Sequence, residues 1–181
     1  LFDDSFTRGR YATDASIYQM MPHGVVVPKT IADIEATIAF CHEQGMALVP
    51  RGGGTSQCGQ TVNHALVLDN TKYLNSILKL DVENRRCIVE PGIVLDELNR
   101  QLKPHGLWFP VDVSTSSRAT IGGMTANNSC GGRSIRYGIM RDNVVAIDAI
   151  LANGSYALFG AYNPAATKPV GWFGEILPDL L

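Results

Sequence analysis

Three consecutive glycines, Gly52 to Gly54, constrain the fold of this chain more than any other feature. They lie between a short apolar run, Ala47 to Val49, which reads as a strand, and two hydroxyl residues, Thr55 and Ser56. Glycine loses more backbone entropy on folding than other residues, so three in a row after a strand require a geometric reason. Consecutive glycine N–H groups can turn inward and bind an anion. We therefore predict a phosphate-binding loop, with a Gly-rich surface turn as the alternative.

Composition excludes several classes of protein. The chain has 181 residues, of which 45% are hydrophobic and 18% charged, so it is long enough and apolar enough for one globular domain. Its formal net charge of −2 argues against a nucleic-acid partner, which requires clustered Lys and Arg. No apolar run approaches the ~20 residues of a transmembrane segment.

Four cysteines and four histidines occur without metal-ligand spacing, so we predict no metal site and free thiols in a reducing compartment. We expect a cytoplasmic protein, with peripheral attachment to the inner membrane as the alternative.

The first half of the chain reads as strand, helix, strand. Val25 to Val27 form the first strand, and the spacing of Thr30 and Asp33 predicts a helix that begins at Thr30. The second strand then runs directly into the glycine loop. A helix crossover between two strands implies that they are parallel. Before them, residues 1–24 are predicted to be an N-terminal arm, with a short turn of helix from Asp14.

The second half reads as two hairpins around a helix. The helix has Leu95, Leu98 and Leu102 on its buried side, and Asn153-Gly154 marks a hairpin turn. We therefore predict an α+β fold in two parts: a small parallel βαβ subdomain at about residues 25–75, and a larger subdomain with a mixed or antiparallel sheet and helices at about 76–160. Residues 161–181 are predicted to be the tail of a truncated chain. The remaining predicted strands are Ala65 to Asp69, Ile77 to Leu80, Cys87 to Val89, Val144 to Ala152 and Ser155 to Phe159.

A second glycine-rich stretch runs from Phe109 to Arg133. It combines many hydroxyls, two Gly-Gly pairs and two side-chain amides with few acidic groups. Opposite the first loop, it can hold a pyrophosphate and the polar edge of an aromatic ring. Ile121 and Met124 are expected to pack in the core, whereas Tyr137 is expected either to stack on a cofactor or to pack with its hydroxyl satisfied.

Generic nucleotide and hydrolase motifs do not fit. The dinucleotide fingerprint GxGxxG has no match, and neither has the nucleophile elbow GxSxG. Residues 54–61 approach the P-loop pattern, but Gln60 stands where that loop requires its phosphate-binding Lys. Chemistry on a magnesium-bound nucleotide is therefore not expected.

Taken together, three segments of the chain resemble the FAD-binding domain of the vanillyl-alcohol oxidase / p-cresol methylhydroxylase superfamily, in the branch of the glycolate oxidase flavin subunit and D-lactate dehydrogenase. They are residues 50–60, residues 114–124 and Arg136-Tyr137-Gly138. The resemblance covers about residues 11–160 and implies FAD between two subdomains. The residues that it implies for cofactor binding are Pro50, Arg51, Gly52, Gly53, Gly54, Thr55, Ser56, Gln60, Pro110, Asp112, Ser116, Ser117, Thr120, Gly122, Gly123, Asn127, Asn128, Ser129, Gly131, Tyr137 and Gly138.

The resemblance also implies a chemistry: hydride removal from a hydroxyl-bearing carbon by flavin N5. Thr55 stands where members with covalent FAD carry His, so FAD is expected to be non-covalent. The catalytic base and the grip on a 2-hydroxy acid are expected in a cap domain that this chain lacks, and an iron–sulfur partner or fused module is expected for electron transfer. A bulky residue at Gly53 is expected to abolish FAD binding and leave the fold intact.

Two alternatives stay open at this point. One is another enzyme of the same superfamily, acting on an alcohol or an amino sugar, or using FAD without redox chemistry as alkylglycerone-phosphate synthase does. The other is a module that binds a nucleotide or phosphosugar and catalyses nothing.

Overall fold

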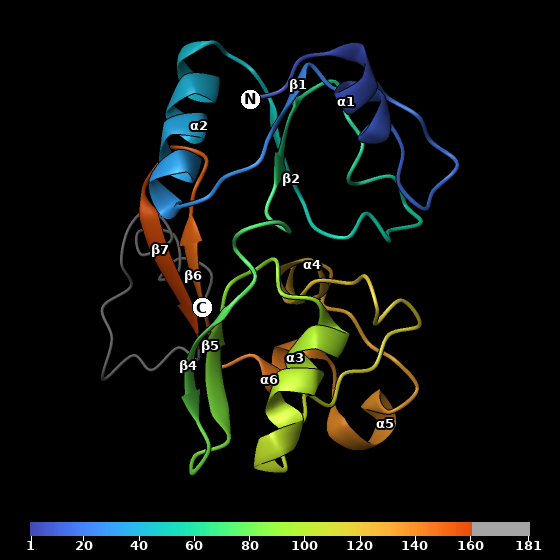
Figure 1. Ribbon diagram of the computed structural model, residues 1–181, viewed down its shortest axis with the longest axis vertical. Coiled ribbons are helices and arrows are strands. Elements are labelled where there is room, and N and C mark those ends of the chain that lie inside the picture. The colour runs from blue at the N-terminus through green and yellow to red at the C-terminus, as the bar shows by residue number, and fades with distance from the viewer. Residues whose placement is uncertain (161–181) are drawn as a thin grey trace, which may run out of the picture.

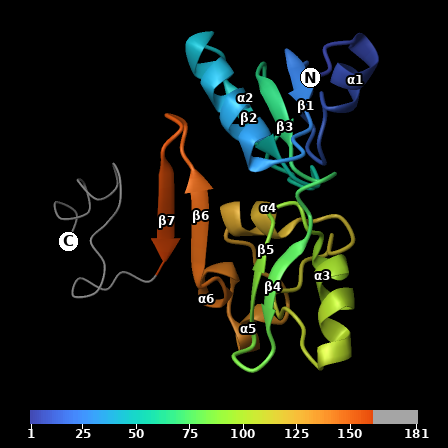
Figure 2. The same cartoon turned by 60° about the vertical axis from the view of Figure 1, so that its left-hand side comes forward.

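The computed structural model describes residues 1–160, in which the α+β class is confirmed. The elements form an upper and a lower group, and the final hairpin lies beside both (Figures 1 and 2). None of the helices in these residues has the length and apolar character needed to cross a membrane. In chain order the elements are α1 (Ser5–Arg10), β1 (Gly24–Val26), α2 (Ile31–Glu43), β2 (Leu48–Arg51), β3 (Leu66–Asp69), β4 (Ile77–Asp81), β5 (Arg86–Val89), α3 (Leu95–Leu102), a 3-10 turn (Lys103–His105), α4 (Ile121–Ala126), α5 (Ser134–Tyr137), α6 (Met140–Asn143), β6 (Ala146–Ile150) and β7 (Tyr156–Gly160).

The upper group contains a three-stranded parallel sheet in the order β1-β3-β2. The predicted helix crossover is present as α2, which begins after Thr30: its hydroxyl accepts from the Asp33 N–H at 3.3 Å, and the Asp33 carboxylate accepts from the Thr30 N–H at 2.9 Å. However, β1 and β2 do not pair with each other, because the fully buried β3 lies between them. In this register Arg51 lies beside Asp69, so the strands end together next to the glycine loop.

The N-terminal segment is ordered differently from the prediction. Its helix is α1, which begins where the Asp4 carboxylate accepts the Thr7 N–H at 2.9 Å. The expected helical turn from Asp14 is wrong. The Asp14 carboxylate instead accepts the N–H of Ser16, two residues on, at 2.8 Å, which stabilises a turn rather than a helix.

The lower group has its own apolar core beneath the β4–β5 hairpin. As predicted, α3 buries Leu95, Leu98 and Leu102. These side chains pack with Ile121 and Met124 of α4, both of which were expected to be core residues. The packing fixes α4, and therefore the second glycine stretch, on the side of the lower group that faces the upper group (Figure 1).

The final hairpin, β6–β7, turns at Asn153-Gly154 as predicted, and Gly154 has a φ of 80° that favours glycine. It forms a two-stranded sheet separate from β4–β5 among the described residues. The Tyr156 hydroxyl donates to the Glu35 carboxylate of α2 at 2.5 Å. The hairpin thereby links the lower group to the upper one. The predicted tail, residues 161–181, lies outside the described residues.

Candidate functional site

The glycine loop leaves β2 with a run of free hydrogen-bond donors. Within residues 1–160, none of the five N–H groups of residues 52–56 has an acceptor. Gly54 has a φ of 64°, a conformation that glycine adopts at no steric cost. Successive unpaired N–H groups form a concave site of positive partial charge that suits phosphate oxygens.

The second glycine stretch lies directly against this loop. A Cβ atom at Gly52 would overlap the hydroxyl of Thr120, and one at Gly53 would overlap the carbonyl oxygen of Arg118. The predicted meeting of the two stretches is therefore confirmed. That a bulky residue at Gly53 leaves the fold intact stays a prediction, but the obstacle is main chain that cannot rotate away, so such a residue requires one of the stretches to move.

A polar bridge joins the two stretches a short distance further on. Gln60 donates its side-chain N–H to the amide oxygen of Asn127 at 2.7 Å, and its own amide oxygen accepts from the Ser56 hydroxyl. Asn127 in turn donates to the Gly123 carbonyl at 3.1 Å. These four predicted site residues form one continuous hydrogen-bonded chain from the upper group to α4.

Two glycines of the second stretch, like the first two of the glycine loop, make room for other segments of the protein. Gly122 donates its N–H to the Pro91 carbonyl at 2.8 Å, and a Cβ there would lie 2.6 Å from the Cβ of Pro91. A Cβ at Gly131 would overlap the main chain of Asp112. Both positions therefore require glycine because two segments of the protein approach closely. Their contact with FAD stays a prediction.

Thr120 starts α4 and is almost fully buried, with 2% of its surface exposed. Its hydroxyl accepts from the Gly123 N–H at 3.2 Å, which satisfies one of the free donors at the helix start. Thr120 thus acts inside the protein, where it fixes α4 against the glycine loop.

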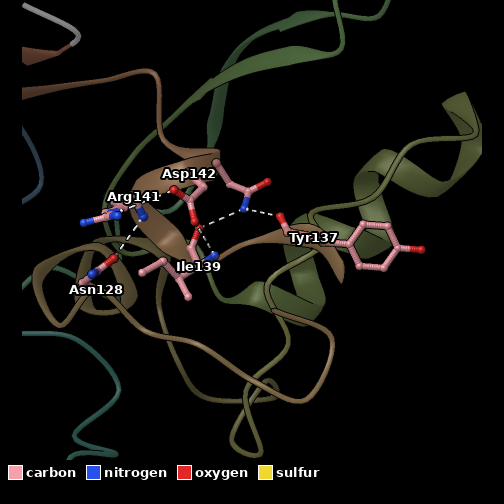
Figure 3. Close-up of polar contacts among 6 residues, drawn as sticks. Asn128, Tyr137, Ile139, Arg141 and Asp142 are labelled. Carbon is pink, nitrogen blue, oxygen red and sulfur yellow. Dashed lines mark hydrogen bonds and ion pairs between the residues drawn. The ribbon is translucent and has the colours of Figure 1, made fainter. Parts of the chain in front are cut away.

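Asp112 and Asn128 are also engaged by the protein. Asp112 accepts from the Arg133 N–H at 2.9 Å. Asn128, which has a φ of 47°, accepts from the Arg141 N–H at 3.0 Å and so fixes the start of α6 (Figure 3). The side-chain N–H donors of Asn128 have no acceptor within the described part of the chain.

Tyr137 packs against protein aromatic surface. Its ring meets that of Trp108 edge to face, with ring centres 5.2 Å apart, and it points away from Asn128 and Asp142 (Figure 3). The guanidinium of Arg136 lies 5.3 Å from the centre of the Tyr137 ring. Of the two expectations for this side chain, these contacts support packing against the protein. The expected satisfied hydroxyl is not present, because the hydroxyl of Tyr137 has no hydrogen-bond partner among residues 1–160 and the residue is 39% exposed.

Several predicted site residues keep their donors free. The hydroxyls of Thr55, Ser116, Ser117 and Ser129 have no hydrogen-bond partner among residues 1–160, and Pro110 is half-buried. Arg51 differs from its predicted role: its guanidinium contacts three main-chain carbonyls, in the N-terminal segment and near Gln60. Tyr11 and Asp69, which contact each other beside it, were missed because no sequence signal links residues so far apart.

The residues present fit a dinucleotide with a diphosphate. The absent side chains at Gly52 and Gly53 make room for the second stretch, and the free donors of residues 52–56 are N–H and hydroxyl groups rather than acceptors. Carboxylates near the loop are already occupied: Asp69 accepts from Tyr11 and Asp14 from Thr61. The local chemistry therefore favours an anionic group at residues 52–56.

Comparisons with known proteins agree with this chemistry. A protein-family profile described as an FAD binding domain matches residues 22–159. D-2-hydroxyglutarate dehydrogenase of Haemophilus influenzae is 41% identical over 155 residues, which are 84% of this chain and 15% of that protein. Glycolate oxidase subunit GlcD of Bacillus subtilis is 40% identical over 158 residues, 84% of this chain and 33% of that protein.

A solved structure of alkyldihydroxyacetonephosphate synthase has the same fold, with a TM-score of 0.78 and 23% identity over 89% of this chain and 32% of that one. The chain spans about 15% of the length of the D-2-hydroxyglutarate dehydrogenases that it matches. The profile match covers most of the chain, including both glycine stretches, and so supports FAD as the cofactor. The chain belongs to the FAD-binding domain family.

Proposed function

We propose that this chain is the FAD-binding portion of a dehydrogenase or oxidase of D-2-hydroxy acids. The observation that carries the proposal is the contact between the two glycine stretches, which presents the free N–H groups of residues 52–56 in a domain of this family. The substrate class is supported by relatives named D-2-hydroxyglutarate dehydrogenase, glycolate oxidase subunit and D-lactate dehydrogenase.

The glycine loop binds the diphosphate of FAD through the N–H groups of residues 52–56, and the hydroxyls of Ser116 and Ser117 line the opposite wall. When bound, FAD supplies the hydride acceptor, flavin N5, for the hydroxyl-bearing carbon of the substrate. Thr55 has no nucleophilic ring nitrogen, so the cofactor is held without a covalent bond at this position. Bare glycine backbone and fixed donors orient the cofactor, which is the protein's part in flavin chemistry.

The remaining steps belong to residues outside this chain. We propose that a cap domain binds the substrate carboxylate and takes the hydroxyl proton, and that an iron–sulfur partner or fused module receives electrons. We also propose an arm at residues 1–24, a cofactor domain at 25–160 and a tail at 161–181. A cytoplasmic location, or peripheral attachment to the inner membrane, belongs to the same proposal.

The test uses the full-length protein, purified with added FAD. Retained flavin absorbance near ~450 nm is expected, because oxidised flavin absorbs there. Under anaerobic conditions, D-2-hydroxyglutarate, D-lactate or glycolate should bleach that band, and the L-enantiomers of the chiral acids should not. Retained flavin that no D-2-hydroxy acid bleaches would exclude the substrate class and favour the alkylglycerone-phosphate synthase type. Tight binding of a nucleotide or phosphosugar without flavin would instead favour the non-catalytic module.

A further inference from the structure

Arg51 is the last residue of β2, and its guanidinium contacts main-chain carbonyls of the protein. One of its terminal nitrogens donates to the carbonyls of Tyr11 and Thr61, at 3.3 and 3.4 Å, and the other donates to the Thr13 carbonyl at 2.7 Å. The guanidinium also lies 5.4 Å from the centre of the Tyr11 ring. The planar guanidinium group thus joins the N-terminal segment to the chain that follows the glycine loop.

Residues 11–16, here called the strap, contact the glycine loop directly. The Ala15 N–H donates to the Gly54 carbonyl at 3.0 Å. A Cβ at Gly54 would lie 3.1 Å from the central guanidinium carbon of Arg51, so the bare loop backbone rests on that group. Asp14 accepts from the Thr61 hydroxyl at 2.8 Å, which ties the strap to the chain that follows the loop. The strap and Arg51 therefore both contact the loop main chain at Gly54.

Tyr11 anchors the strap to the centre of the sheet. Its hydroxyl donates to the Asp69 carboxylate at 2.5 Å, and Asp69 is the buried last residue of β3. The second oxygen of Asp69 accepts from the Thr71 N–H at 2.8 Å and from the Thr71 hydroxyl at 2.7 Å. The carboxylate is thereby fixed, and so is the tyrosine that bonds to it.

We propose that Arg51 and Tyr11 are positioning residues that hold the strap against the glycine loop and so direct the N–H groups of residues 52–56 at the diphosphate of FAD. Arg51 acts through main-chain geometry rather than by neutralising phosphate charge. Gly52 to Gly54 have no side chains that could fix their conformation, so contacts from the strap and Arg51 hold this part of the loop, while the Ser56 hydroxyl holds its end through Gln60. Residues 11–16, which lie outside the glycine motif, thereby take part in positioning the cofactor-binding loop.

The experiment compares Arg51→Lys and Arg51→Met in the full-length protein, with Arg100→Lys as the matched control. Lys keeps the charge but cannot span three carbonyls with a planar fork. Both Arg51 variants are expected to weaken FAD binding by the same factor, tenfold or more, in a flavin fluorescence titration. Amide hydrogen exchange at Ala15, whose N–H donates to the Gly54 carbonyl, should accelerate in the FAD-free variants while β3 keeps its protection. Arg100, an exposed residue paired with Glu97, should show neither effect on substitution.

A second variant covers the case in which the Arg51 variants do not fold. Tyr11→Phe keeps the ring and removes only the hydroxyl, and Tyr73→Phe is its control, because the exposed Tyr73 hydroxyl has no hydrogen bond among residues 1–160. Tyr11→Phe should weaken FAD binding several-fold and accelerate amide exchange at Ala15. If Arg51→Lys bound FAD with wild-type affinity while Arg51→Met bound it more weakly, Arg51 would act through its positive charge, and the proposal would be overturned. Wild-type affinity and exchange in Tyr11→Phe would overturn it equally.

Discussion

Replacing Gly53 with alanine tests whether the two glycine stretches are in the contact described here. The added Cβ would lie 2.9 Å from the carbonyl carbon of Arg118 and would overlap its oxygen. Carbon atoms in contact prefer about 3.5–4.0 Å, so the gap is short by about 0.6 Å or more. The contact joins the main chain of the glycine loop to the main chain of the second stretch. The overlap can therefore be relieved only if one of the two stretches moves. Overpacking of this kind costs about 1–3 kcal/mol.

The consequence for the cofactor follows from the same displacement. A loop that moves by about 1 Å loses at least one N–H contact to the diphosphate, and a hydrogen bond to a charged group contributes about 1.5–3 kcal/mol. Since 1.4 kcal/mol is about a factor of ten in affinity, the dissociation constant for FAD should rise tenfold or more. The assays are a flavin fluorescence titration and thermal unfolding of the full-length protein without FAD.

Gly9→Ala is the matched control for this prediction. Gly9 lies in α1, and a Cβ there meets no atom within 4 Å. Alanine is the better helix former, so this variant should be as stable as the wild type or more stable by up to about 1 kcal/mol. The reasoning fails if Gly53→Ala matches Gly9→Ala in melting temperature and binds FAD within twofold of the wild type.

Three further predictions concern stability and its pH dependence. Thr120→Val should lower the free energy of unfolding by about 1 kcal/mol in urea denaturation, because it removes the hydroxyl that caps α4, and Thr120→Ser should retain most of it. Hydrogen bonds from Arg100 and Gln101 lower the pKa of Glu97 to about 2. The resulting stabilisation is present above the ordinary pKa of 4.5 and is lost as pH falls through about 2; an NMR titration should show this, and Arg100→Ala should return the pKa toward 4.5. Burial, followed by the hydrogen bond to Asp69, raises the pKa of Tyr11 to about 12, so its contribution is complete below pH 10 and is lost as pH rises through about 12. Because Tyr11 is only partly buried, the loss should be about 1 kcal/mol in thermal unfolding across that range, and Tyr11→Phe should not show it.

Features set by a few neighbouring residues could be predicted from the sequence. Thr30 with Asp33 marked the start of α2, and the spacing of Leu95, Leu98 and Leu102 identified the buried side of α3. Each depends on atoms three to seven residues apart, which a sequence shows directly. The sequence also pointed to the glycine loop, whose N–H groups lack acceptors in residues 1–160, and its binding of an anion stays a prediction.

Features set by distant partners could not be predicted in the same way. Arg51 was expected to face phosphate, but its acceptors are main-chain carbonyls, which every residue carries and no sequence pattern marks. Gly131 was expected to face the cofactor, yet its missing side chain makes room for Asp112. The strand order was also hidden, because periodicity shows that a segment is a strand and not which strand lies beside it.

The order β1-β3-β2 has a consequence for synthesis of the chain. The central strand, β3, is the last of the three to be synthesised. Until it emerges from the ribosome, β1 and β2 have no neighbouring strand to pair with. A nascent chain that ends before Leu66 therefore has no parallel ladder at all, and α2 has no sheet to cover. Once residues 66–69 emerge, both ladders can form around a single inserted strand, whereas the glycine loop still lacks its contacts with residues 118–120.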